Sequence, residues 1–145
     1  MARAVINYTV SDEGRDLGKT FVITEMSATQ AERWATRVLL AFMQSNPEVP
    51  EGLDQMGLAG LAQIGIKALA GVRWETLDPL LEEMMTCVKI MPDKKKPAII
   101  RDLIESDIEE VATRIKLRAE IWTLHMGFLK TVAPSIFAGT KATAG

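Results

Sequence analysis

The sequence is poor in the residues that catalytic and metal sites most often use. Among its 145 residues it contains one cysteine, Cys87, and one histidine, His125. A single cysteine excludes an internal disulfide and gives no sign of an oxidising compartment. One cysteine and one histidine also cannot supply the ligands of a structural zinc site. We therefore expect no bound metal.

The familiar catalytic motifs are missing as well. The sequence has no GxxxxGK[ST] motif, no GxGxxG after a predicted strand and no GxSxG. His125 lies between two apolar stripes of a predicted helix, where a histidine bonded to a carbonyl is expected more often than a general base. Cys87 falls late in another predicted helix, where the dipole disfavours a thiolate, so it is interpreted as a packing residue. We expect no enzymatic activity and no cofactor.

An excess of positive charge is also lacking. The formal net charge is -2, which disfavours nucleic acid as a bulk electrostatic partner. Lys94, Lys95 and Lys96 lie between Pro92 and Pro97, a pattern typical of a solvated loop, with no aromatic interleaved for base stacking. We expect no nucleic-acid partner.

Long apolar runs are absent too. Residues 53–72 come nearest to a membrane span, but they contain Asp54, Gln63 and Lys67 and are rich in glycine. The first residues lack the apolar core of a signal peptide before their first charges. We expect a cytoplasmic protein without a membrane partner.

The composition is that of one globular domain. Apolar residues make up 48% and charged residues 25%, while the aromatic share of 6% and the 8 methionines indicate an aliphatic, adaptable core. Residues 1–132 are expected to form a single helical domain with an N-terminal hairpin. Residues 133–145 are small and polar and are expected to form a flexible tail.

The N-terminal third predicts a hairpin followed by a helix. Residues 5–10 alternate weakly, and residues 20–24 have the β-branched and aromatic content of a strand. Ser27 with Gln30 forms a capping-box pattern, and helical spacing then continues from about residue 28 to 45. Asn46 and Pro47 end this helix, because a residue before proline is disfavoured in the helical region.

Three further helices are predicted. Residues 53–72 have helical spacing interrupted by glycines, and the next helix opens at Asp78 and Pro79 and ends near Ile90. A long helix over residues 106–130 begins with a capping box of Ser106 and Glu109. One apolar stripe of this helix comprises Ile108, Val111, Ile115, Ala119, Trp122, Met126 and Leu129, and a second comprises Leu117, Ile121, Leu124 and Phe128. The predicted fold is therefore mainly α, a compact bundle of about four helices with a short N-terminal β-hairpin.

The predicted helices carry more apolar surface than one small core plainly needs. Glycine-rich and methionine-bearing grooves are suited to accept another helix. The alternative is a monomeric bundle that uses all of this surface internally, and periodicity does not separate the two. Trp34 and Trp122 are assigned to the core. The candidate partner-binding residues are Leu58, Leu61, Ile64, Leu69, Trp74, Met84 and Met85.

Two segments resemble a known family. Residues 21–35, FVITEMSATQAERWA, and residues 115–128, IKLRAEIWTLHMGF, resemble the tail assembly chaperones of siphovirus-type phages, which have long flexible tails. The resemblance implies a chaperone that binds the tape measure protein, keeps it soluble and gathers tail tube protein around it. It further implies a protein of the host cytoplasm that is absent from the mature virion. We also expect self-association through the excess apolar surface.

Two other function classes stay open. One is a helical DNA-binding or regulatory protein encoded by a phage, which should shift duplex DNA at low salt and release it as salt rises. The other is a permanent structural component of the tail or connector, which would remain in purified particles where a chaperone would not.

Overall fold

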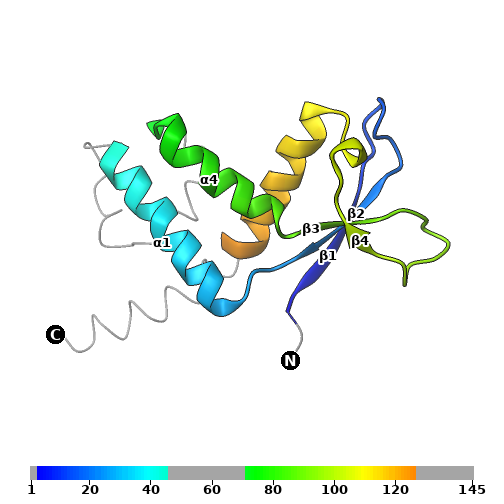
Figure 1. The fold of residues 1–145 in the computed structure, drawn as a ribbon, viewed down its shortest axis with the longest axis horizontal. Coiled ribbons are helices and arrows are strands. Elements are labelled where there is room, and N and C mark those ends of the chain that lie inside the picture. Colours follow the sequence, from blue (N-terminus) through cyan, green and yellow to red (C-terminus); the bar gives the residue numbers. More distant parts are fainter. Residues whose placement is uncertain (1–2, 46–70, 127–145) are drawn as a thin grey trace.

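A computed structural model gives the structure of residues 3–45 and 71–126. Within these ranges, three α-helices pack on one face of a four-stranded antiparallel sheet (Figure 1). The helices are α1 (Ala28–Ser45), α4 (Trp74–Met85) and a helix over residues 111–126. The predicted bundle of about four helices is therefore wrong, since a sheet forms one of the two layers. Most of the predicted helix, residues 53–70, and the tail over 133–145 lie outside the described residues.

The sheet has the order β1-β2-β3-β4, so each strand pairs with its neighbour in the chain. Its strands are β1 (Val5–Thr9), β2 (Thr20–Thr24), β3 (Val88–Met91) and β4 (Arg101–Asp102). The central strand β2 places Phe21 and Ile23 fully inside the core. The predicted hairpin is confirmed, and α1 spans the predicted residues 28–45. Strands β3 and β4 turn this hairpin into a sheet.

The predicted helix over 78–90 is in fact a shorter helix followed by a strand. Helix α4 begins at Trp74 because the carbonyl of Arg73 accepts from the amides of Thr76 and Leu77, which leaves Pro79 inside the helix. The helix ends where the hydroxyl of Thr86 donates to the Glu83 carbonyl at 2.6 Å. The residues beyond it then pair with β2, with Ile90 opposite Phe21. Because the apolar residues up to Ile90 continue the helical spacing, the sequence pattern does not reveal this change to β structure.

The last helix also begins later than predicted. Residues Glu105–Asp107 form a 3-10 turn, Ile108 is extended, and the α-helix begins at residue 111. The capping box of Ser106 and Glu109 does not form. Instead, the backbone amide of Glu109 donates to the carboxylate of Asp16 at 3.0 Å. An acceptor from the β1–β2 loop therefore replaces the local cap.

Two tryptophans hold the helices together, as predicted. Trp34 is fully buried and donates through Nε1 to the Leu80 carbonyl of α4 at 3.1 Å. Its ring meets the buried Trp122 edge to face, with the ring centroids 5.9 Å apart. Of the two predicted stripes on the last helix, Leu117 and Ile121 are fully buried. Val111 and Ile115 are largely exposed, so the apolar arc that reaches the core is narrower than predicted.

His125 ties the last helix to the junction between β2 and α1. Its Nε2 accepts from the Met26 amide at 2.9 Å, so Nδ1 carries the proton and donates to the Ile121 carbonyl at 2.8 Å. The prediction of a helix histidine bonded to a carbonyl is confirmed. Both ring nitrogens are occupied by backbone groups, which makes this residue a structural link.

Replacing His125 with phenylalanine should lower the free energy of unfolding by about 1–3 kcal/mol, because the Met26 amide loses its acceptor in a partly buried place. Urea denaturation followed by circular dichroism measures this loss. Thr123→Val, at an exposed position on the same helix, is the matched control and should change the free energy of unfolding by less than about 0.5 kcal/mol. Equal losses in the two variants would contradict the structural role of His125.

Candidate functional site

The predicted partner-binding residues have different positions in the structure. Trp74 is the first residue of α4 and is 63% exposed, so it is available to a partner. Met84 is fully buried and Met85 is nearly so. Their side chains serve the core, and only Met85 also reaches a surface groove. Four residues, Leu58, Leu61, Ile64 and Leu69, lie outside the described residues, and their role stays a prediction.

A groove lies between the C-terminal end of α4 and the segment that leads to the last helix. It is lined by Glu82, Met85, Thr86, Leu103, Ile104, Glu105, Ile108 and Arg114. Met85, Leu103 and Ile108 are buried or half-buried, whereas the side chain of Ile104 is 60% exposed. Half of the lining residues are therefore apolar and half are polar or charged. The exposed side chain of Ile104 beside the apolar half can accept an apolar group from a partner.

Charged side chains form the rim of this groove. Arg114 Nη2 lies 3.0 Å from Glu82 Oε1, so this arginine is already paired. Glu105 is exposed and has no ion-pair partner among residues 3–45 and 71–126. The rim therefore offers an unpaired negative charge, which favours a partner with a basic residue next to its apolar one.

Asp107 shapes the segment that carries Ile104. Its carboxylate accepts from both terminal nitrogens of Arg101, at 2.7 and 2.8 Å, and from the Ile104 amide at 2.7 Å. The Arg101 guanidinium lowers the pKa of this carboxyl below its ordinary value. The turn is closed by a charged pair and a backbone bond, which holds the backbone of Ile104 in place beside the groove.

Asp16 fixes the other end of the same segment. Its carboxylate accepts from the Glu110 amide at 2.9 Å and from the Thr113 hydroxyl at 2.7 Å, in addition to the Glu109 amide. Burial to 1% exposure would by itself raise the pKa of this carboxyl. The hydrogen bonds from Glu109, Thr113, Lys19 and Glu110 outweigh burial and hold the pKa well below its usual range. Asp16 thus acts as an ionised helix cap.

Lys19 links the carboxylate of Asp16 to the backbone of Asp107. Its Nζ donates to Asp16 Oδ1 and to the Asp107 carbonyl, both at 2.9 Å. We call Asp16, Lys19, Asp107 and Thr113 the Asp16 cluster. A carboxylate with a strongly lowered pKa and fully used oxygens is unsuited to proton transfer near neutral pH. The cluster is therefore a structural support for the groove.

Gly14 lets the β1–β2 loop approach the start of the last helix. It has a φ of 146°, and a Cβ at this position would lie 3.2 Å from Glu110 Oε1. The neighbouring Arg15 donates through Nε to the same oxygen at 3.0 Å. A side chain at residue 14 would both strain the backbone and crowd this ion pair.

Other chemistry finds little support in the described residues. Cys87 is buried, and burial raises the pKa of its thiol to about 11, so the thiol stays protonated at neutral pH. Among the side chains of residues 3–45 and 71–126, no three His, Cys, Asp or Glu are grouped to hold a metal ion. None of the described helices combines the length and the apolar content that a bilayer crossing requires.

Sequence reasoning missed both the groove and the Asp16 cluster. Residues from Ser106 onward were predicted to be helical, which placed Ile108 on a helix stripe, whereas it lines the groove together with Leu103 and Ile104. Asp16 lies in a polar loop between Gly14 and Gly18, and this position was the only local sign of a special role.

Comparison of the chain with protein-family models, with curated proteins and with solved structures gives no match. The resemblance of residues 21–35 and 115–128 to tail assembly chaperones therefore rests on those residues alone. The groove is interpreted from its own geometry.

Proposed function

We propose that this protein is a tail assembly chaperone of a siphovirus-type phage. In this proposal it binds the tape measure protein in the host cytoplasm, keeps it soluble, helps to recruit tail tube subunits and is absent from the mature virion. The observation that carries the proposal is the groove beside α4, where the exposed Ile104 lies next to Met85, Leu103 and Ile108 within a rim of charged side chains. The resemblance of residues 21–35 and 115–128 supplies the identity of the client.

The groove has the physical properties of a transient client site. Burying the exposed part of one isoleucine contributes at most about 1.5–3 kcal/mol, so a contact of this size is weak and reversible. The unpaired carboxylate of Glu105 adds a preference for a basic residue on the client. Trp74, exposed at the start of α4, is a second candidate anchor because tryptophan buries a large area on binding. Weak binding suits a chaperone that must leave its client.

Replacing Ile104 with aspartate should reduce co-purification with a co-expressed, tagged fragment of the tape measure protein by about tenfold, the equivalent of about 1.4 kcal/mol. The substitution would replace the exposed apolar side chain of the groove with a charge next to the acidic Glu105 in the chain. The matched control is Ile99→Asp, because Ile99 is 53% exposed in the loop between β3 and β4, away from the groove. Circular dichroism should show the same helix content in both variants.

Equal recovery of the fragment with both variants would show that the groove is not the client site. Mass spectrometry of purified particles provides an independent measurement, because a permanent tail or connector component would be found there and a chaperone would not. A shift of duplex DNA at low salt would favour the DNA-binding alternative.

A further inference from the structure

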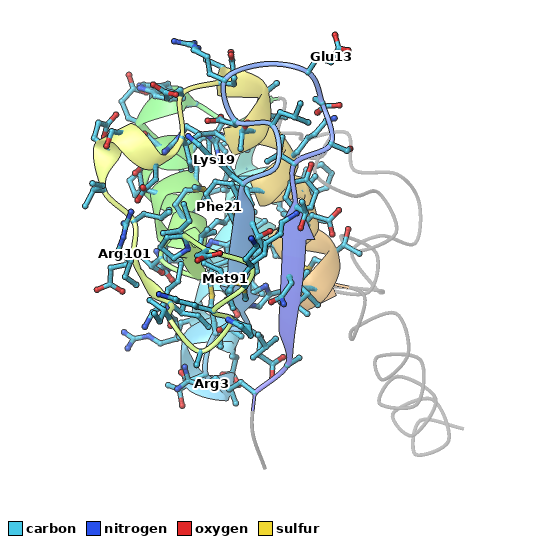
Figure 2. The ribbon with its side chains drawn as sticks, turned by 90° about the vertical axis from the view of Figure 1, so that its right-hand side faces the viewer. Arg3, Glu13, Lys19, Phe21, Met91 and Arg101 are labelled. Atoms are coloured by element: carbon cyan, nitrogen blue, oxygen red, sulfur yellow. The ribbon has the colours of Figure 1, made fainter. Side chains whose placement is uncertain are left out.

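Strand β1 forms an outer edge of the sheet, with β2 on its inner side and no other described strand beyond it. Figure 2 shows this edge with Arg3 near one end and Glu13 near the other. The strand pairs with β2 in an uninterrupted antiparallel register from Val5 opposite Thr24 to Thr9 opposite Thr20. Its outer backbone groups are therefore arranged as a regular row.

The register shows which residues turn their backbone groups outward. At the two ends, the Glu25 amide donates to the Ala4 carbonyl at 3.0 Å and the Val10 amide donates to the Lys19 carbonyl at 2.9 Å. Inward bonding in an antiparallel pair recurs at every second residue. The even-numbered residues of β1 therefore bond to β2. The outward row consists of Val5, Asn7 and Thr9, whose side chains are also exposed.

Within residues Val5–Thr9, this edge lacks three features that often prevent pairing with another strand. Residues Val5–Thr9 contain no charge and no proline, and their pairing with β2 contains no bulge. Natural sheets usually protect an exposed edge with at least one of these features. The edge is thus suited to accept a further strand.

We propose that the outer edge of β1 pairs with β1 of a second copy of this chain, antiparallel and about a two-fold axis through Asn7. In this register Asn7 lies opposite Asn7 of the second copy, and Val5 of each copy lies opposite Thr9 of the other. Every outward amide and carbonyl of the row then has a hydrogen-bond partner. The two sheets then form one continuous sheet across the dimer.

Charge at the two ends of β1 favours a second copy in this direction. Arg3 precedes the strand, whereas Glu13 follows it, and neither has an ion-pair partner among residues 3–45 and 71–126. Antiparallel pairing of two copies brings the Arg3 end of each copy toward the acidic end of the other. Parallel pairing would bring like charges together, which is unfavourable. This inference is independent of the proposed chaperone function.

Replacing Asn7 with proline tests the proposal, because proline removes the outward amide at the centre of the row. Proline is tolerated at edge positions whose amide does not bond within the sheet. Asn7→Thr keeps the amide and is the matched control. Sedimentation equilibrium should show a concentration-dependent doubling of mass for the wild type and N7T, and a dimer at least about tenfold weaker for N7P. A dimer that N7P leaves equally strong would overturn the proposal, as would a wild type that stays monomeric.

Amide hydrogen exchange of the wild type provides a second measurement that needs no variant. Exchange at Val5, Asn7 and Thr9 should slow as the protein concentration rises, while exchange at Ile6 and Tyr8 should not change. Concentration-dependent protection elsewhere, with none at these three amides, would place the dimer contact on another surface and reject the β1 edge. Because this measurement uses the natural chain, it decides the question even where N7P fails to fold.

Discussion

Replacing Asp16 with alanine should lower the free energy of unfolding by about 3–5 kcal/mol, the usual cost of breaking a buried charged pair. The change leaves the amides of Glu109 and Glu110 and the hydroxyl of Thr113 without their acceptor. It also leaves Lys19 without the carboxylate that it contacts at 2.9 Å. Because a domain of this size has only about 5–15 kcal/mol of stability, the loss should be obvious in urea denaturation.

Conservative and control variants sharpen this prediction. Asp16→Asn should fall between the wild type and the alanine variant, because its amide oxygen can still accept from the backbone but carries no charge. Asp12→Asn, in the same loop, removes an exposed ion pair with Lys116 and should change stability little. A loss for Asp16→Ala as small as that for Asp12→Asn would show that the Asp16 cluster does not support the fold.

The same variants should differ in their response to acid. The folded state holds the pKa of Asp16 and of Asp107 below the ordinary value. A carboxyl of this kind stabilises the folded state fully above the ordinary aspartate pKa of about 4, and its contribution is lost as the pH falls below that value. The free energy of unfolding of the wild type should therefore fall between about pH 4 and pH 2, and Asp16→Asn should show a shallower fall. Parallel pH profiles would contradict this assignment.

Replacing Trp34 with alanine should cost about 3–5 kcal/mol of stability, as expected for a large side chain lost from a packed core. Trp34 is fully buried, donates to the Leu80 carbonyl and packs against Trp122. The substitution thus opens a cavity where α1, α4 and the last helix meet. Thermal unfolding should show a correspondingly lower Tm.

Trp74→Ala is the matched control, since Trp74 has the same side chain but is 63% exposed. This variant should change the free energy of unfolding by less than about 0.5 kcal/mol. Trp34→Phe should lie between the two, because a smaller aromatic ring still fills part of the site and the hydrogen bond to Leu80 is lost. If Trp34→Ala were as stable as Trp74→Ala, the described core would be wrong.

Local signals in the sequence were sufficient for the N-terminal elements. The β-branched content of residues 20–24, the cap at Ser27 and the proline after Asn46 each act within a few residues, and the hairpin and α1 appear where they predict. The burial of Trp34 and Trp122 followed from helical spacing in the same way. These features depend on short-range sterics, hydrogen bonding and periodicity, which a single segment contains in full.

Only the tertiary structure decided the sheet, the start of the last helix and the groove. Val88–Met91 has apolar spacing that a helix end would share, and it becomes β3 because β2 offers an edge to pair with. The last helix begins at residue 111 because Asp16, 93 residues before Glu109, caps it. The displaced segment then places Ile104 beside α4. Strand pairing and a cap from a distant residue depend on which segments meet in space. A local sequence pattern carries no information about the segment that a strand or a helix end will meet.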